Sequence, residues 1–358
     1  MITVFGATGY TGVLVSQALD RRKLPFRIAG RSAQKLEALS DRLSCHPQWV
    51  VADVHTTSTL SSLVEGTSVL INCVGPFTDL GEKVVRLAIG SKCHYLDSSN
   101  ELGYIYRMQT YHKLAEKVMV SVVPACAFEV ALADIAAALV FQKLETPAID
   151  EMRVVYHLQG VHSSGGTRRS LLRSLATSWI GYQKGQWKGY LPGSHAKKEH
   201  IRGEWVPVLS IPSGESVTIP NHIPVSTVTV WMKTNPIQAI VGPILIPYLA
   251  RFLRSIAGPW IQKIITLGSP QPTLNPENQN DCFQISIIAF DHKQGIRKTI
   301  ELSGGNPYVV TGEIMADAAA LLYENRVQKN GVISPAQVFE NSSTDYLSRW
   351  GVSIHWDQ

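Results

Sequence analysis

The sequence predicts an α/β protein with an N-terminal, doubly wound parallel sheet of the Rossmann type and a second α+β domain. An apolar strand at residues 2–5 runs directly into a glycine-patterned turn and a helix, and strand and helix patterns then alternate through the first third of the chain. From about residue 147 the pattern changes to longer, β-branched strands. We therefore expect domains at 1–146 and 147–305, followed by a C-terminal segment at 306–358.

The glycine turn, Gly-Ala-Thr-Gly-Tyr-Thr-Gly, predicts a nucleotide site. Gly6 would turn the chain off the strand, Gly9 would let the backbone approach a diphosphate, and Gly12 would let the helix pack closely on the sheet. The helix N-terminus favours the negative charge of a diphosphate. A purely structural glycine turn is the alternative, since the spacing differs by one residue from G-x-G-x-x-G. The residues expected to bind here are Gly6, Thr8, Gly9, Tyr10, Thr11 and Gly12.

The end of the second strand indicates which nucleotide binds. Arg31 lies 19 positions beyond Gly12, about where an acidic residue would hold the ribose 2′-hydroxyl of NAD. Arg31, Ser32 and Lys35 offer a guanidinium, a hydroxyl and an ammonium to a 2′-phosphate, which favours NADP(H). Alternatively, these basic side chains are solvated residues in the first turn of a helix.

The ends of the later strands point toward the same crevice, because ligands of such sheets bind beyond the carboxyl ends of the strands. Strands are expected at 26–30, 49–53, 69–74, 94–96 and 119–123, with helices at 32–43 and 80–90. Asp53 and Val54 would border the adenine, although Asp53 is equally well explained as a helix cap. Near the nicotinamide ribose we expect Cys73, Val74, Gly75 and Pro76. Cys73 is interpreted as a small buried hydrophobe rather than a nucleophile.

Composition excludes several classes of protein. The 358 residues carry a net charge of +5 and are 45% hydrophobic, without the basic and aromatic pattern of a nucleic-acid-binding protein. The five cysteines form no C-x-x-C pair and no cluster with histidine, so neither a metal site nor a disulfide framework is expected. Because the chain begins directly in the first strand, we expect no targeting peptide and a cytoplasmic location.

Several motifs together resemble the saccharopine dehydrogenase-like oxidoreductases, in particular the branch with the trans-acting enoyl reductases. They are the glycine turn at 6–12, Ala-Gly-Arg at 29–31, Asn-Cys-Val-Gly-Pro-Phe at 72–77, His-Tyr-Leu-Asp-Ser-Ser-Asn-Glu at 94–101 and Ser-Gly-Gly-Thr at 164–167. The resemblance implies a nicotinamide-dependent oxidoreductase whose segment 306–358 returns to the Rossmann domain. One departure is Ala125-Cys126-Ala127-Phe128-Glu129, where a Gly-Phe-Asp type of sequence is expected.

The second domain is less specific. We expect strands at 149–159, 228–232, 284–290 and 297–302, and helices at 167–183 and 311–328. The helix that starts at Thr167-Arg168-Arg169 offers an anion site, or else an ordinary N-cap with solvated arginines. The apolar stretch 236–268 is interrupted by Pro243 and Pro247, so a membrane-spanning helix is disfavoured. It could pack within the domain or a dimer, line a lipid-like substrate, or contact a membrane surface.

The expected activity is an NADPH-dependent reduction of an apolar enoyl, carbonyl or imine substrate, small or carrier-bound, by a homo-oligomeric enzyme. Tyr95 and Asp97 are the proposed catalytic residues, with His94, Glu101, His162 and Arg168 as further candidates near the crevice. The alternatives are a saccharopine dehydrogenase-like amino-acid oxidoreductase and a non-catalytic NADP-binding partner of a synthase.

Overall fold

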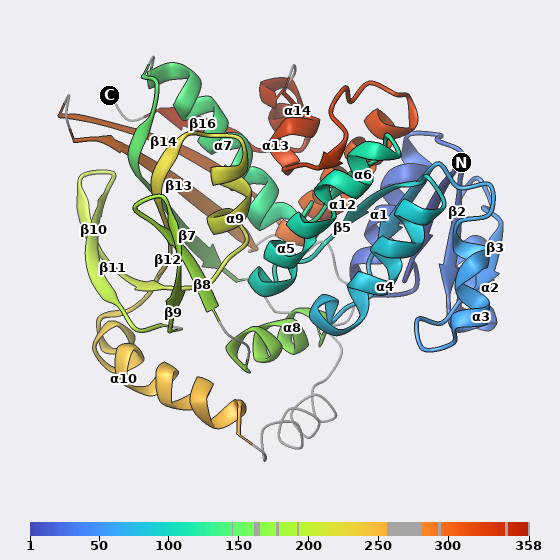
Figure 1. Cartoon of the computed structure of the whole chain (residues 1–358), viewed down its shortest axis with the longest axis horizontal. Helices are drawn as coiled ribbons and strands as arrows, with labels where there is room; N and C mark the ends of the chain where they lie inside the picture. The colour runs from blue at the N-terminus through green and yellow to red at the C-terminus, as the bar shows by residue number, and fades with distance from the viewer. Residues whose placement is uncertain are drawn as a thin grey trace. The chain divides into compact units, whose positions relative to one another are not determined.

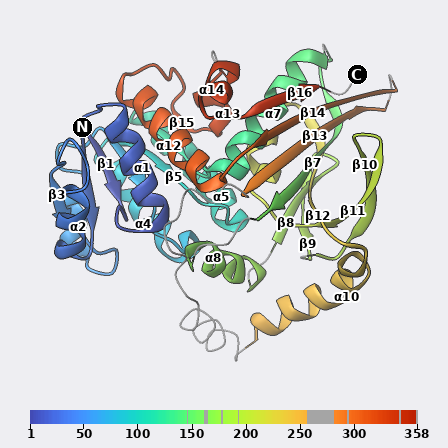
Figure 2. The same ribbon diagram turned by 180° about the vertical axis from the view of Figure 1, so that it is seen from behind.

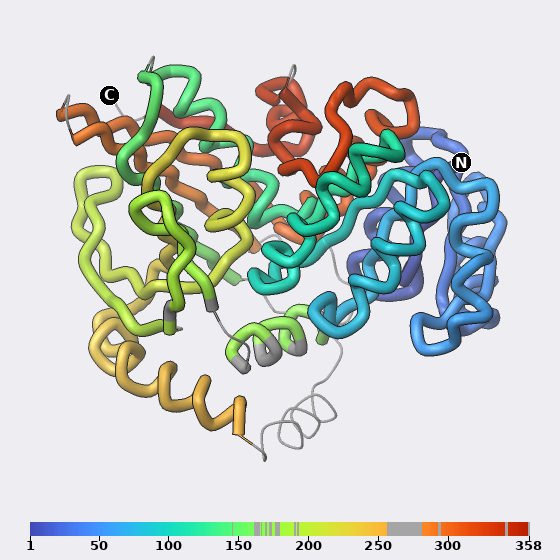
Figure 3. The backbone as a smooth tube through the Cα atoms, viewed as in Figure 1, coloured from blue at the N-terminus to red at the C-terminus, as the bar shows by residue number. Residues whose placement is uncertain are grey.

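The computed structural model describes residues 1–144, 146–160, 165–176, 179–191, 193–255, 281–292, 295–340 and 343–356, and Figure 3 traces their backbone. The chain forms two compact units. Unit 1 comprises Met1–Asn100, Tyr104–Ala131 and Tyr308–Asn341, and unit 2 comprises Glu101–Gly103, Leu132–Pro307 and Ser342–Gln358. The division falls inside a helix, between Ala131 and Leu132, whereas the expected boundary at 146 follows the end of that helix.

Unit 1 is built on a parallel sheet of seven strands in the order β15-β6-β5-β4-β1-β2-β3. The predicted doubly wound sheet is therefore confirmed. Its strands are β1 (Ile2–Phe5), β2 (Phe26–Gly30), β3 (Trp49–Val51), β4 (Val69–Asn72), β5 (His94–Asp97), β6 (Ser121–Val123) and β15 (Gly331–Val332). Every residue of β1 and of β4 is buried, as expected when helices cover both faces of a parallel sheet.

Helices cover the two faces of this sheet. Figure 1 shows α4 and α6 in front of the sheet, and Figure 2 shows α1 and α12 on the opposite face. The helices that belong wholly or in part to unit 1 are α1 (Tyr10–Arg21), α2 (Ala33–Ser40), α3 (Thr57–Leu60), α4 (Phe77–Gly90), α5 (Leu102–Met108), α6 (His112–Lys117), α7 (Phe128–Leu144), α12 (Pro307–Tyr323) and α13 (Pro335–Val338).

The C-terminal part of the chain contributes to both units. In unit 1, β15 pairs in parallel with β6, and α12 packs on α1 at Gly312, where a Cβ atom would lie 3.0 Å from the backbone of Leu14. Arg22 donates to Glu313 and Asp317 across the same helix pair. In unit 2, the last strand pairs with β14.

Unit 2 contains a mixed sheet in the order β10-β11-β12-β7-β13-β14-β16, with β8 paired to β12 and β9 paired to β8. Its long central strands β7, β12 and β13 carry much of the buried core, including Val154, Val230 and Ile287. The elements are β7 (Ile149–Gln159), α8 (Gly165–Ala176), β8 (Trp179–Gln183), β9 (Gln186–Tyr190), β10 (Ala196–Ile201), β11 (Glu204–Ser210), α9 (Glu215–Thr218), β12 (Val225–Lys233), α10 (Pro236–Leu253), β13 (Cys282–Asp291), β14 (Ile296–Gly304), α14 (Ser343–Arg349) and β16 (Ser353–Trp356).

The prediction of a helix over 167–183 is wrong beyond Ala176. Residues Trp179–Gln183 form β8, which pairs antiparallel with β9. The two residues between these strands, Lys184 and Gly185, have φ of 51° and 72°. Two consecutive positive φ values are the geometry of a tight hairpin turn, and Gly at the second position permits it. The Lys-Gly pair between two aromatic-rich runs was the missed signal.

Candidate functional site

The glycine turn between β1 and α1 has the geometry that a dinucleotide requires. Gly6 has a φ of +80°, and a Cβ atom on Gly12 would lie 2.2 Å from the carbonyl oxygen of Gly6. Gly9 is the N-cap of α1 and is exposed. No side chain caps the N-terminus of α1, so the positive end of the helix dipole is available to favour a negatively charged ligand. The turn therefore fits a diphosphate.

The turn lies where the order of the strands reverses, between β1 and β4. Phe5 is in register with Ala29 on one side and with Asn72 on the other, and Asn72 is in register with Asp97. The carboxyl ends of these strands thus form one edge. Cys73 follows β4 there, and its N–H donates to the carbonyl oxygen of Phe5 over 2.9 Å. Such a reversal is where open α/β sheets bind their ligands.

The end of β2 presents the predicted basic residues to solvent. Arg31 and Lys35 are exposed, and Ser32 is the N-cap of α2. The Ser32 hydroxyl accepts from the Lys35 backbone N–H over a long 3.4 Å. Thr8 of the glycine turn is close to this end of β2, since its hydroxyl oxygen is 3.7 Å from where a Gly30 Cβ would be. A guanidinium and an ammonium are therefore available beside the turn, and we predict that they bind a 2′-phosphate.

We expect Arg31→Ala to weaken NADPH binding by about 10- to 100-fold, because a charge-assisted hydrogen bond to phosphate is lost. Binding of NADH, which has no 2′-phosphate, should change by less than about 3-fold. Fluorescence titration of both cofactors measures this difference. Arg42→Ala, which removes another exposed arginine near α2, is the matched control and should leave both affinities unchanged. Equal losses for the two cofactors in Arg31→Ala would contradict the assignment.

Asp53 forms its own turn at the end of β3. Its Oδ1 accepts from the N–H of His55 over 2.9 Å, and the Thr59 hydroxyl bonds the Asp53 backbone. Val54, the other residue expected beside the adenine, is buried. The structure thus favours the turn-forming role of the Asp53 carboxylate, while both residues remain next to the edge where the nucleotide is predicted.

The loop after β4 packs against the glycine turn. A Cβ atom on Gly6 would lie 2.8 Å from Cγ2 of Val74 and 3.1 Å from the backbone of Cys73. The Gly75–Pro76 peptide bond is cis, and Pro76 is the N-cap of α4. Burial, with the nearby Asp97 carboxyl, raises the pKa of the Cys73 thiol to about 12. The thiol is therefore protonated at neutral pH, which argues against a nucleophilic role, although Cys73 is half-buried rather than buried.

Tyr95 and Asp97 belong to a closed hydrogen-bond network at the end of β5. Oδ2 of Asp97 accepts from the hydroxyls of Tyr95, at 3.0 Å, and Tyr104, at 2.6 Å. Oδ1 accepts from the hydroxyl and the backbone N–H of Ser99 and from the N–H of Ala125. Asn72 donates from Nδ2 to the Tyr95 hydroxyl and accepts from the N–H of Val74. The network joins the loops after β4, β5 and β6.

This geometry favours a positioning role for both residues over the catalytic role that we predicted. Tyr95 and Asp97 are fully buried, and their polar atoms are engaged inside the protein. Burial raises the pKa of Tyr95 and of Asp97 above their usual values. Ala125 has a φ of +59°, which is uncommon for alanine, and its bond to Asp97 holds that turn. Tyr104, which the sequence analysis did not identify, completes the network.

Of the further candidates, Glu101 is buried in unit 2 and accepts from the Ser170 hydroxyl over 2.7 Å. Burial lowers the pKa of His94, whose Nδ1 accepts from the N–H of Ser121. Arg168 lies in α8, and His162 lies outside the described residues. Within the described residues, no group of three His, Cys, Asp or Glu side chains could hold a metal ion.

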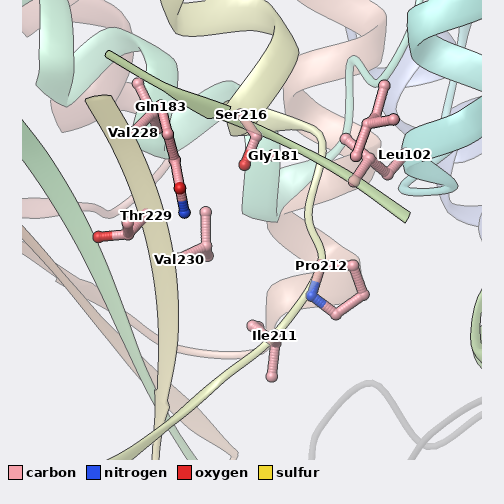
Figure 4. Close-up of a pocket in the computed structure, with 10 residues that line it drawn as sticks. Leu102, Gly181, Gln183, Ile211, Pro212, Ser216, Val228, Thr229 and Val230 are labelled. Carbon is pink, nitrogen blue, oxygen red and sulfur yellow. The ribbon is translucent and has the colours of Figure 1, made fainter. Parts of the chain in front are cut away.

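Unit 2 contains a small pocket, shown in Figure 4, that the sequence did not reveal. Its wall is mainly apolar, and its polar members are neutral. Gln183 and Ser216 extend toward the space beside Val230 in the figure, whereas the hydroxyl of Thr229 points away from it. The lining residues are Leu102, Ile180, Gly181, Gln183, Ile211, Pro212, Ser216, Val228, Thr229 and Val230.

A buried acid lies directly before Ser216 in the sequence. Glu215 is fully buried and accepts a short hydrogen bond from the Tyr156 hydroxyl, while its Oε2 has no partner in the described structure. Burial raises the pKa of Glu215, and the nearby Asp134, which pairs with His222, adds to this effect. Its sequence context, Ser-Gly-Glu-Ser, resembles an exposed loop and carries no signal of burial.

The edge of unit 1 defines the class of this protein, a Rossmann-type protein that binds a dinucleotide at a switch point. Residues 2–123 match the family described as the saccharopine dehydrogenase NADP binding domain. Over this part of the chain the match confirms the resemblance to saccharopine dehydrogenase-like oxidoreductases, and it supports NADP(H) as the cofactor.

Two relatives show the extent of the similarity. The "Trans-acting enoyl reductase" of Mycobacterium ulcerans is 35% identical over 134 residues, which are 36% of this chain and 32% of the relative. The human "Saccharopine dehydrogenase-like oxidoreductase" is 28% identical over 152 residues, 37% of this chain and 35% of the relative. The matches thus span about a third of each relative's length.

A solved structure extends the likeness in fold to the whole chain. Apo saccharopine dehydrogenase (L-Glu forming) from Saccharomyces cerevisiae aligns with a TM-score of 0.64, covering 100% of this chain and 99% of the yeast chain. At 13% sequence identity the likeness concerns the fold alone. It includes the second unit, which the family match at residues 2–123 does not reach.

Proposed function

We propose that this protein is an NADPH-dependent reductase that transfers hydride to an apolar enoyl, carbonyl or imine substrate, small or carrier-bound. The cofactor class rests on the match of residues 2–123 to an NADP binding domain, and the uncharged lining of the small unit 2 pocket favours an apolar group over a charged one. A dicarboxylic amino acid would need cationic side chains to offset the cost of removing its carboxylates from water. An acyl chain needs only apolar contact. The mycobacterial relative is named as an enoyl reductase, which agrees with this substrate class.

The residues of unit 1 have distinct roles in this proposal. The glycine turn holds the diphosphate, and Arg31, Ser32 and Lys35 select the 2′-phosphate. The network of Asp97 holds the loop from Cys73 to Pro76 against the turn, where the nicotinamide ribose is predicted. Bound NADPH supplies the hydride. No buried side chain of the network is required as a proton donor, because solvent can supply the proton.

Stopped-flow measurement of NADPH oxidation tests the proposal. We expect hydride loss with medium- or long-chain enoyl or β-ketoacyl thioesters, or with an apolar imine, and none with glutamate plus an aldehyde. In the reverse direction, saccharopine should not reduce NADP+. Ile211→Lys, which places a charge at a half-buried position of the pocket, should raise KM for the thioester by about 10-fold or more without changing NADPH affinity. Ile211→Leu is the matched control and should retain the wild-type KM.

Two other outcomes would replace the proposal by its alternatives. Turnover of the dicarboxylic amino acid alone would identify a saccharopine dehydrogenase-like amino-acid oxidoreductase. Tight NADPH binding without oxidation by any substrate of the panel would favour a non-catalytic NADP-binding partner of a synthase. A KM that is the same in Ile211→Lys and the wild type would show that the unit 2 pocket does not receive the substrate.

A further inference from the structure

The helix α10 exposes a continuous apolar face. Its outward side chains recur every three or four residues, so they share about half of the helix circumference. Ile237 and Ile240 are 74% and 73% exposed, and Tyr248 is 65% exposed. The remaining members of this face are Val241, Ile244, Leu245, Leu249 and Phe252. A face this large is uncommon on a protein surface unless something covers it.

The opposite face of α10 is packed on unit 2. Gly242, Pro247, Ala250 and Leu253 are buried. A Cβ atom on Gly242 would lie 3.1 Å from the side chain of Leu209 in β11. Figures 1 and 2 both show the helix lying along the end of the strands β10 and β11. The helix is thus held on its inner side while its apolar side faces outward.

The charged residues that flank α10 in the sequence are all positive. The sequence contains no Asp or Glu from Ser216 to Pro276, while Lys233 precedes the helix and Arg251 and Arg254 lie at its C-terminal end. Arg251 and Arg254 are exposed. The Arg251 guanidinium lies 6.0 Å from the ring centre of Tyr248. An apolar face that ends in an aromatic and two arginines complements the acyl and anionic headgroup layers of a lipid surface.

We propose that α10 is a lipid-surface-binding element that lies in the plane of an anionic membrane or monolayer, with its apolar face in the acyl boundary. Within the described residues, α10 is the one helix that is long and apolar enough to span a membrane. However, Pro243 and Pro247 lie inside it and cannot donate to the carbonyl groups four residues earlier. In a bilayer core those groups would lack water, whereas an interfacial helix keeps its inner side on the protein.

Vesicle flotation with the full-length protein tests this proposal. We expect the protein to float with vesicles of phosphatidylcholine and phosphatidylserine and to float less with phosphatidylcholine alone. Ile244→Glu should reduce the bound fraction at least about 10-fold, because a carboxylate would enter the acyl boundary. Met119→Glu, a matched change at a residue of unit 1 that is 71% exposed, should bind like the wild type.

Charge and self-association are tested separately. Arg251→Gln combined with Arg254→Gln should remove the preference for anionic vesicles and leave binding to neutral vesicles unchanged. The proposal is overturned if the wild type does not float, or if Ile244→Glu floats equally well. It is also overturned if light scattering shows a wild-type dimer that Ile244→Glu converts to monomers without any vesicle binding, since a second copy would then cover the face.

Discussion

Replacing Gly12 by alanine is expected to abolish useful NADPH binding, raising Kd by at least about 100-fold, or roughly 3 kcal/mol. The new Cβ atom would lie 2.2 Å from the Gly6 carbonyl oxygen and 2.7 Å from Cα of Ala7. Both contacts are with backbone, so α1 or the turn must move. A displacement of this size separates the helix N-terminus from the diphosphate that it is expected to bind. NADPH titration, together with the thermal midpoint, measures the effect.

Two further glycine variants make this prediction specific. In Gly9→Ala the new Cβ atom would lie 3.2 Å from the carbonyl oxygen of Gly6, a contact that a small shift relieves. We expect this variant to fold normally and to lose an intermediate amount of NADPH affinity. In Gly90→Ala, a change within α4, the new Cβ atom would have no neighbour within 4 Å, so this variant should bind NADPH like the wild type. Wild-type affinity in Gly12→Ala would show that the turn does not bind the cofactor. If Gly12→Ala does not fold, the NADPH affinity of Gly9→Ala still tests whether the turn binds the cofactor.

Removing the Asp97 carboxylate is expected to destabilise the protein by about 4 kcal/mol or more. In Asp97→Ala, five buried hydrogen-bond donors lose their acceptor. They are the hydroxyls of Tyr95 and Tyr104, the hydroxyl and N–H of Ser99 and the N–H of Ala125. Each unsatisfied buried donor costs about 1–3 kcal/mol. Since whole domains are stable by only about 5–15 kcal/mol, Asp97→Ala should be poorly soluble or largely unfolded. Urea denaturation or the thermal midpoint measures the loss.

Tyrosine variants separate positioning from catalysis. Tyr104→Phe removes one donor to Asp97 and should cost about 1–2 kcal/mol. Tyr95→Phe should likewise lower the thermal midpoint but keep turnover within about 10-fold of the wild type, because solvent supplies the proton. If Tyr95 were the general acid, its loss would lower kcat by about 100-fold or more at unchanged stability. That result would restore the catalytic role that the sequence suggested.

Local patterns in the chain were sufficient to predict the glycine turn and the parallel strands around it. The strand, turn and helix at residues 2–21 lie within one short segment, and Gly6 and Gly12 occupy positions where a Cβ atom does not fit. Arg31 directly follows a strand whose register with β1 is the usual parallel one. Such features depend on the backbone geometry of a few neighbouring residues, so they can be predicted from the residue types at those positions. The same holds for the alternation of strands and helices in the first third.

The burial and the partners of the polar groups were decided only by the tertiary structure. Nothing near Tyr95 in the sequence distinguishes a catalytic hydroxyl from one sealed against Asp97 and Tyr104. Likewise, Glu215 resembles a loop residue until the sheet of unit 2 buries it beside Tyr156. β15 pairs with β6, although some two hundred residues separate the two strands in the sequence. Burial arises when segments far apart in sequence pack together, and burial decides whether a polar group faces solvent or a partner inside the protein. The glycine turn, the parallel strands and the preference for NADP(H) rest instead on short-range chemistry that the residues themselves carry.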